Sequence, residues 1–197
     1  ADMARGLAHE IKNPLTPIML SAERLQNKLS GKLDMDKETI LSKSTKMIID
    51  QVSALKTMVD EFQQYARLPS AVPTSIKLDV ILIEFLQMYS SDNRISFINN
   101  LKEKNFFIQF DRDQLLQVLH NILQNAQDAV LGKSNGKIKI ICEVAGDNEN
   151  QKVNLIIEDN GFGINEDILP KIFEPYTTTK SQGTGLGLAI VKKIVKE

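Results

Sequence analysis

The chain has 197 residues, 42% hydrophobic and 25% charged, which is an ordinary composition for one large folded domain or two small ones. Its 24 lysines and arginines balance 25 aspartates and glutamates, and the resulting net charge of −1 argues against a nucleic-acid-binding protein, which normally carries a basic excess. No apolar run approaches the roughly 20 residues that span a bilayer, so we expect no membrane contact within this sequence.

Both ends of the sequence indicate a piece of a longer protein. The chain opens without Met inside one helical pattern, ends at Glu197 inside another, and lacks the apolar core of a signal peptide. The single cysteine, Cys142, cannot form an internal disulfide, which fits a reducing compartment. We therefore expect a cytoplasmic fragment in which Cys142 is a small buried hydrophobic residue.

Residues 1–68 predict two long amphipathic helices, joined by a turn at 30–37. Their apolar residues recur at steps of three and four, close to a heptad repeat. These positions are Leu7, Ile11, Ile18, Ala22, Leu25 and Leu29, then Ile40, Ser44, Met47/Ile48, Val52, Leu55, Val59, Phe62 and Ala66. Two helices alone leave an apolar stripe uncovered, so we expect this antiparallel hairpin to form a four-helix bundle by homodimerisation.

His9 lies off this apolar seam, next to Glu10 and one turn before Asn13. A lone exposed histidine is most often a simple surface residue, and a zinc-protease helix is excluded because Asn13 stands where the second histidine ligand belongs. Glu10 could accept a proton from the imidazole, and Asn13 could orient water toward a group attached to it. Pro14 and Pro17 remove two helical N–H donors, so we expect a bend beside His9.

Two prolines, Pro69 and Pro73, indicate a linker at 69–76. In the second domain, 77–197, helices and strands mix, which predicts an α+β fold class with helices on one face of a mixed sheet. The expected elements are a helix at 78–90, strands near 95–99 and 106–110, a helix capped by Asp111, strands at 137–145 and 152–158, and a helix from about 186.

Several stretches of this second domain indicate a nucleotide site. Asn121 and Asn125 lie one turn apart on a helix, where their side-chain oxygens suit a hard ion such as Mg²⁺. Asp159 follows a strand and could accept a hydrogen bond from an amine such as that of adenine. Gly161 and Gly163 would let the backbone approach a flat ring.

A second glycine-rich stretch holds Gly183, Gly185 and Gly187, the last of which open a helix whose N–H groups favour phosphate. A Walker loop is excluded because Gln127 stands at the position of its first glycine. A dinucleotide-binding fingerprint is excluded because Ile190 stands at the position of its third.

Taken together, these residues resemble the two-component sensor histidine kinases over nearly the whole chain. Five motifs occur in family order: His9-Glu10-x-x-Asn13-Pro14-Leu15 resembles the H box, Asn121 to Ala126 the N box, Asp159-x-Gly161-x-Gly163 the G1 box, Phe173-x-Pro175 the F box and Gly183-x-Gly185-x-Gly187 the G2 box. The first belongs to the dimerisation and histidine-phosphotransfer hairpin, and the others to the GHKL-type ATP-binding domain. The residues around His9 are most similar to the nitrogen-regulation NtrY-like subgroup.

The resemblance implies that His9 attacks the γ-phosphate of ATP, with Glu10 as its base. The phosphoryl group then passes to an aspartate on the receiver domain of a partner response regulator. Asn13 would orient water for dephosphorylating that regulator. The parent protein would be anchored in the inner membrane. Two alternatives stay open: a GHKL ATPase in which His9 has no role, and a phosphatase-biased or non-catalytic dimeric regulator.

For the ATP site the resemblance implies that Asn125 holds Mg²⁺ with Asn121 close to the phosphates, and that Asp159 reads the adenine amine. Residues 176–185 would be a mobile lid, with Lys180 as a phosphate contact. The remaining nucleotide-binding residues would be Gly161, Gly163, Phe173, Gly183, Gly185 and Gly187. Family members continue past the last helix with two more strands, so this ATP-binding domain is expected to be truncated at its C-terminus.

Overall fold

The computed structural model describes residues 2–66, 68, 70–101, 106–146, 152–180 and 183–196, without the side chains of 2–10 and 12. The chain divides into two compact units. The first comprises Ala1–Leu68 and Tyr176–Leu186, and the second Pro69–Pro175 and Gly187–Glu197. None of the helices in the described part of the chain is long and apolar enough to cross a membrane.

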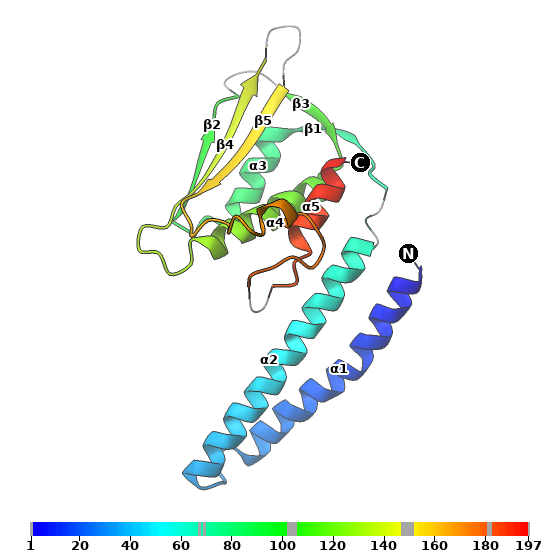
Figure 1. The fold of residues 1–197 in the computed structure, drawn as a ribbon, viewed down its shortest axis with the longest axis vertical. Helices are drawn as coiled ribbons and strands as arrows, with labels where there is room; N and C mark the ends of the chain where they lie inside the picture. Colours follow the sequence, from blue (N-terminus) through cyan, green and yellow to red (C-terminus); the bar gives the residue numbers. More distant parts are fainter. Residues whose placement is uncertain are drawn as a thin grey trace. The chain divides into compact units, whose positions relative to one another are not determined.

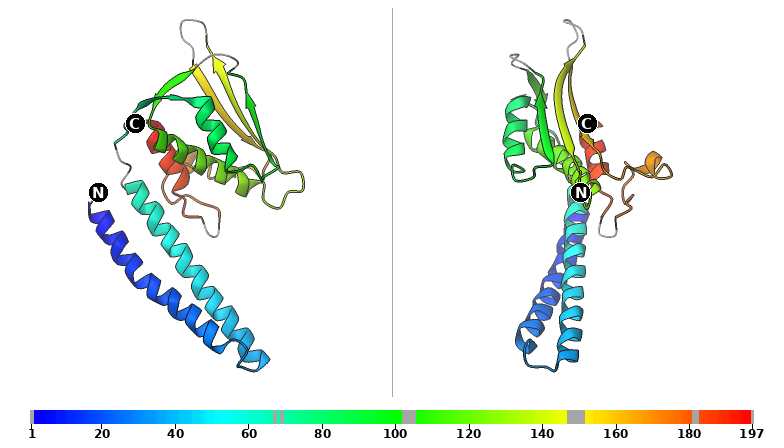
Figure 2. Two further views of the ribbon diagram at one scale, coloured as in Figure 1. Left: turned by 180° about the vertical axis from the view of Figure 1, so that it is seen from behind. Right: turned by 90° about the vertical axis from the view of Figure 1, so that its left-hand side faces the viewer.

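The first unit contains the expected helical hairpin. Helix α1 spans Asp2–Leu29 and helix α2 spans Met35–Ala66, and the two lie side by side, joined by a short turn (Figures 1 and 2). Helix α1 continues through Pro14 and Pro17, and the Ser21 hydroxyl donates a 2.8 Å hydrogen bond to the Pro17 carbonyl. The hairpin is therefore the fold element that carries the segment around His9.

The turn between the two helices is shorter than the predicted range 30–37, because α2 already begins at Met35. Asp34 explains this early start. Its carboxylate accepts a 3.0 Å hydrogen bond from the Lys37 N–H and one of 2.6 Å from the Lys37 ammonium, which caps the first turn. These bonds, the ammonium first, lower the pKa of Asp34.

Among the side chains of the hairpin that the structure describes, a narrow line is buried: Leu15, Ala22, Thr45, Val52 and Val59. The polar member, Thr45, donates its hydroxyl proton to the Leu41 carbonyl at 2.8 Å, so its burial leaves no donor unsatisfied. Most of the predicted seam stays exposed, including Ile18, Leu25, Ile40, Met47, Ile48 and Leu55. The single hairpin therefore buries only part of its apolar surface.

The second unit contains two small sheets. Strands β1 (Thr74–Lys77) and β3 (Phe107–Phe110) pair antiparallel. Strand β2 (Ile95–Asn99) pairs parallel with β4 (Ile138–Ala145), which pairs antiparallel with β5 (Lys152–Asp159). The helices are α3 (Leu78–Gln87), α4 (Arg112–Ala129) and α5 (Gly187–Lys196), with a 3₁₀ turn at Leu169–Lys171. The mixed α+β fold is confirmed.

Two boundaries differ from the sequence prediction. Strand β1 occupies part of the predicted linker at 69–76, because Ile76 is buried and pairs with Ile108 of β3 despite the nearby prolines. Helix α3 ends at Gln87 rather than at residue 90. Pro69, the first linker residue, lies outside the described residues.

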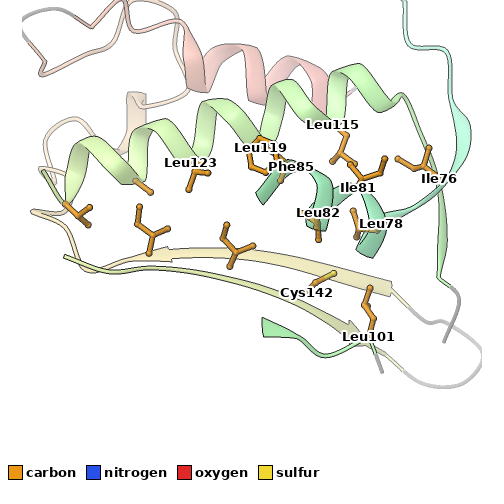
Figure 3. Close-up of a cluster of buried hydrophobic side chains, with 14 residues drawn as sticks. Ile76, Leu78, Ile81, Leu82, Phe85, Leu101, Leu115, Leu119, Leu123 and Cys142 are labelled. Carbon is orange, nitrogen blue, oxygen red and sulfur yellow. The ribbon is translucent and has the colours of Figure 1, made fainter. Parts of the chain in front are cut away.

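The core of the second unit lies between α3 and α4 on one side and the β2–β4–β5 sheet on the other (Figure 3). Leu82, Leu119, Leu123 and Ile140 are fully buried there. Cys142 is also buried, as predicted, and burial, followed by the nearby Asp79 charge, raises the pKa of its thiol to about 11. The thiol is thus a packing group rather than a nucleophile at neutral pH.

Helix α4 begins with the predicted cap. The Asp111 carboxylate accepts hydrogen bonds from the N–H groups of Asp113 at 3.0 Å and Gln114 at 3.1 Å. It also accepts one from the Val72 N–H at 2.9 Å, which ties the segment before β1 to the start of α4. Together these bonds, that of Val72 first, lower the pKa of Asp111.

Candidate functional site

The first part of the site is one face of α4. Leu115, Leu119 and Leu123 face the sheet, and Asn121 and Asn125 lie half-buried one turn apart. Helix α5 packs against α4, and its first residue, Gly187, lies beside Asn121. A Cβ atom placed on Gly187 would be 3.5 Å from Oδ1 of Asn121. The structure thus brings Asn121 of the N box next to the glycine that begins α5, with Asn125 one turn further along α4.

The second part is the loop that follows β5, residues 159–163, called here the Asp159 loop. Asp159 is exposed, and its Oδ1 atom accepts a 2.8 Å hydrogen bond from the Gly161 N–H. The Phe162 N–H donates to the Ala129 carbonyl, the last residue of α4, at 3.1 Å. The loop is therefore attached to the C-terminal end of the helix that carries Asn121.

Asn160 attaches the same loop to the segment between α4 and β4. Its side-chain oxygen accepts a 2.7 Å hydrogen bond from the Lys137 N–H, and its side-chain nitrogen donates one of 2.9 Å to the Asn135 carbonyl. Its own N–H donates to the Lys137 carbonyl at 3.2 Å. Asn160 is therefore bonded through both its backbone and its side chain, which restricts the positions open to the neighbouring carboxylate.

The two glycines of the Asp159 loop serve different purposes. A Cβ atom on Gly161 would lie 2.5 Å from Cβ of Ala129 and 2.6 Å from its carbonyl oxygen, so packing against α4 already requires glycine there. Gly163 has a φ of +76° with nothing close to its Cβ position, so backbone conformation requires glycine instead. The expectation that both approach a nucleotide base stays a prediction.

Phe173 lies after the 3₁₀ turn and is 42% exposed. The ammonium of Lys192, on α5, lies 6.0 Å from the centroid of its ring, at the outer limit of a cation–π contact. Phe173 is thereby associated with the helix that Gly187 begins. The assignment of Phe173 to nucleotide binding stays a prediction.

The segment Tyr176–Leu186 belongs to the first unit. Its two ends meet where the Tyr176 N–H donates a 3.0 Å hydrogen bond to the Gly185 carbonyl, with φ of +66° and +70° at these two residues. A Cβ atom on Gly183 would lie 2.5 Å from the Thr178 hydroxyl, so this glycine permits a tight fold within the loop. Lys180 lies exposed in the same loop. The assignment of these residues to phosphate binding stays a prediction.

His9 and Glu10 lie in α1, but their side chains are outside the described part of the structure. Asn13 is exposed one helical turn after His9, so the backbone places the two residues on the same face of α1. Among the described residues there is no group of three or more His, Cys, Asp and Glu side chains that could hold a metal ion.

One contact of the Asp159 loop was missed by the sequence reasoning. Lys133, in the turn after α4, donates hydrogen bonds from its ammonium to the carbonyls of Asn160 and Gly161. In the sequence Lys133 figures only in a failed Walker motif, and its partners lie 27 and 28 positions further along. No periodic pattern links two turns at such a distance, so nothing in the sequence could have shown this contact.

Two family models match the chain. The model HisKA, the His Kinase A (phospho-acceptor) domain, matches residues 1–71. The model HATPase_c, for histidine kinase-, DNA gyrase B- and HSP90-like ATPases, matches residues 110–197. The first contains His9 and Asn13, and the second contains α4, the Asp159 loop and α5.

Relatives cover the full chain. A putative sensor histidine kinase NtrY-like of Rickettsia conorii is 37% identical over 201 residues, which is 100% of this chain and 32% of that protein. Nitrogen regulation protein NtrY of Azorhizobium caulinodans is 39% identical over 202 residues, 100% of this chain and 26% of its own length. This chain therefore spans about a third or less of these curated relatives.

A solved structure of the histidine kinase ThkA in complex with response regulator protein TrrA matches with a TM-score of 0.62 at 30% identity, over 98% of this chain and 54% of that one. Its match, like those of the NtrY-like relatives, includes both the hairpin and the α+β unit. Since the two family models also follow one another along the sequence, the chain belongs to the sensor histidine kinases, with a HisKA domain followed by a HATPase_c domain.

Proposed function

We propose that this chain is the kinase core of a two-component system: it binds ATP in the second unit, phosphorylates His9, and passes the phosphoryl group to an aspartate of a response regulator. The observation that carries the proposal is the convergence on α4 of the N-box asparagines, the Asp159 loop and Gly187. The family membership supplies the phosphate acceptor, because the HisKA match includes His9.

In the proposed reaction an imidazole nitrogen of His9 forms a bond to the γ-phosphorus of ATP. The bond from that phosphorus to the β,γ-bridging oxygen breaks, and ADP leaves. Glu10, the adjacent residue, accepts the imidazole proton. Little other covalent work falls to the protein in phosphoryl transfer, so its main contributions are positioning and neutralisation of charge.

We assign the adenine base to the C-terminal end of α4, where the Asp159 loop is attached, and the phosphates to the region of Asn121 and Gly187. Asp159 is exposed, and its carboxylate retains acceptor capacity beyond the hydrogen bond from Gly161, as reading the adenine amine requires. Asn121 lies beside Gly187, where the N–H groups that begin α5 favour a phosphate. The separation of these residues along α4 supports an extended nucleotide rather than a bare phosphate.

Mg²⁺ would accompany the phosphates. The side-chain oxygens of Asn125, with Asn121 one turn away, are hard donors of the type that Mg²⁺ prefers, and they leave most coordination positions to phosphate and water. When bound, Mg²⁺ would neutralise the charge that develops on the transferring group.

The partner would be a response regulator, as it is for the similar histidine kinase ThkA, whose solved complex contains the response regulator TrrA. We further propose that Asn13 gives the chain phosphatase activity toward that regulator, since its exposed carboxamide shares a helix face with His9 and could orient water. ATP is a cytoplasmic substrate, so this region would act there. Anchoring of the whole protein in the inner membrane remains a prediction of the family resemblance.

We also propose that the hairpin forms a homodimer. The observation that supports it is the exposed apolar side of the seam, for which Ile40 and Met47 are each 65% exposed. A second hairpin packed on this side would bury those residues in a four-helix bundle.

The experiment that tests the kinase proposal uses γ-labelled ATP with Mg²⁺, followed by acid or base treatment of the labelled chain. We expect a label that acid removes and base does not, and its complete loss in His9→Ala. The matched control is His120→Ala, because His120 is the only other histidine and its ring instead hydrogen-bonds the Tyr89 hydroxyl at 2.8 Å. Hydrolysis of ATP without any label on the chain would favour the alternative of a GHKL ATPase.

A further inference from the structure

Lys133 holds the Asp159 loop by direct hydrogen bonds from its side-chain ammonium. It follows Gly132, whose φ of +80° turns the chain away from the end of α4. The Lys133 N–H completes the turn by donating to the Val130 carbonyl at 3.1 Å. Its ammonium does not cap the carbonyls of α4 but reaches the Asp159 loop. A residue that only ended the helix would not make these contacts.

The Lys133 ammonium contacts three successive residues that follow Asp159 in the loop. It donates to the Asn160 carbonyl and, at 3.0 Å, to the Gly161 carbonyl, and it lies 5.2 Å from the centroid of the Phe162 ring. Phe162 is 77% exposed, so its cation–π contact is the weaker part of this arrangement. The two hydrogen bonds from a charged donor fix the orientation of two successive peptide groups.

Those two peptide groups determine where the Asp159 carboxylate points. Oδ1 of Asp159 accepts its hydrogen bond from the N–H of Gly161, which belongs to the first of them. Rotation of this first peptide would move that N–H and release the carboxylate. The ammonium bonds to the carbonyl of that same peptide group, so Lys133 acts on the donor that orients Asp159.

We propose that Lys133 is a positioning residue for nucleotide-base recognition: by fixing the peptides after Asp159 it sets the preference of the site for a base that presents an amine, adenine, over one that presents a carbonyl, guanine. This inference rests on the proposed role of Asp159. It adds a specificity determinant outside the five sequence motifs, in a turn that contacts the Asp159 loop from behind.

The test measures the dissociation constants of ATP and GTP for the full chain, in Mg²⁺, by calorimetric titration. Lys133→Met removes the ammonium and keeps most of the side-chain volume. We expect it to weaken ATP binding about tenfold, the effect of losing hydrogen bonds to a charged group, and GTP binding by less than a factor of two. Lys133→Arg, which keeps the charge and the donors, should restore most of the ATP-to-GTP ratio.

The matched control is Lys139→Met, which makes the same change at an exposed position of β4 and should leave both constants unchanged. If Lys133→Met weakens the binding of ATP and of GTP equally, or weakens the binding of neither nucleotide, the proposal is overturned. If Lys133→Met does not fold, Lys133→Gln takes its place, and an unchanged ratio in this variant has the same consequence.

Asp159→Asn separates this inference from the function on which it rests. Collapse of the ATP-to-GTP ratio in Asp159→Asn but not in Lys133→Met would overturn the role of Lys133 alone. An unchanged ratio in Asp159→Asn, or no preference for ATP in the parent chain, would overturn the role of Asp159 and, with it, that of Lys133.

Discussion

At the scale of single residues, Gly161 is a position where one added methyl group has a large expected consequence. In Gly161→Ala the new Cβ would lie 2.5 Å from Cβ of Ala129, and neither atom belongs to a flexible side chain. The Asp159 loop would have to move away from α4, which we expect to cost about 1–3 kcal/mol of folding free energy. Urea unfolding measures this cost, and a nucleotide titration should show ATP binding weakened at least tenfold.

Gly163→Ala is the comparison for this variant. Its Cβ would meet nothing within 4 Å, so the only penalty is the φ of +76°, which we expect to cost about 1 kcal/mol. A larger loss of stability in Gly163→Ala than in Gly161→Ala would contradict the assignment of steric packing to Gly161.

The Asp92 carboxylate accepts hydrogen bonds from two different side chains. Its oxygens accept bonds from Nε and Nη2 of Arg94 at 2.8 and 2.7 Å, and from the Gln127 side chain on α4 at 2.9 Å. The Arg94 side chain, above all, holds the pKa of Asp92 far below its ordinary value. We expect Asp92→Ala to lower the free energy of unfolding by about 1–2 kcal/mol at pH 7, measured with urea.

The pH dependence of this difference has a definite sign. Because the pKa of Asp92 is lower in the folded state, its contribution is complete above the unfolded value of about 3.9 and is lost as pH falls toward the folded value. The stabilities of the parent chain and Asp92→Ala should therefore converge below about pH 4. A constant difference between pH 7 and pH 3 would show that the charge is not the cause.

At the scale of elements, the apolar seam of α2 is only partly covered within the hairpin. Val52 and Val59 are buried against α1, whereas Ile48 and Leu55 are 41% and 45% exposed on the same helix. We expect Ile48→Glu and Leu55→Glu each to weaken the proposed dimer about tenfold or more, since each removes apolar burial and adds a charge. Sedimentation equilibrium at micromolar concentration measures this effect.

Met35→Glu provides the control, because Met35 is 87% exposed at the start of α2, beside the turn. It should leave the dimer unchanged. A parent chain that sediments as a monomer at the same concentration would contradict the dimer itself.

The elements also show what local sequence can predict. The cap of α4 by Asp111 and the strands around Ile140 follow from side-chain chemistry and alternation, which act between neighbours in the chain. Strand β1 was missed because its stability comes from the pairing of Ile76 with Ile108, far along the chain. The burial of Thr45 was not predicted, because the sequence does not show that its hydroxyl bonds to its own helix and can therefore be buried like an apolar side chain.

At the scale of the whole molecule, the proposed kinase activity depends on His9, whereas the proposed phosphatase activity depends on Asn13 on the same face of α1. We expect Asn13→Ala to keep autophosphorylation within about twofold, because Asn13 has no part in the attack on ATP, and to slow dephosphorylation of the regulator at least tenfold. Phosphate release from a phosphorylated receiver domain measures the second rate. Equal loss of both activities would contradict this division of roles.

The candidate site was predictable to the extent that it depends on motif residues. Asn121 lies beside Gly187, Asn125 lies one turn further along α4, and the Asp159 loop is attached to the end of α4. The contacts that hold these residues in place were not predictable, because the Lys133 ammonium bonds to backbone carbonyls, which any residue supplies. The sequence motifs therefore identify the candidate site, whereas the structure shows what supports it.

The parallel pairing of β2 with β4 has a consequence for the order in which the molecule folds. Ile95 lies opposite Ile138, and the chain between the two strands contains β3 and α4, so their pairing joins distant parts of the sequence. The hairpin instead depends on contacts between helices joined by a short turn. Because local contacts form faster than distant ones, we expect α1 and α2 to assemble first. A folding chain would then possess its phosphate acceptor helix before it possesses a site for the phosphate donor.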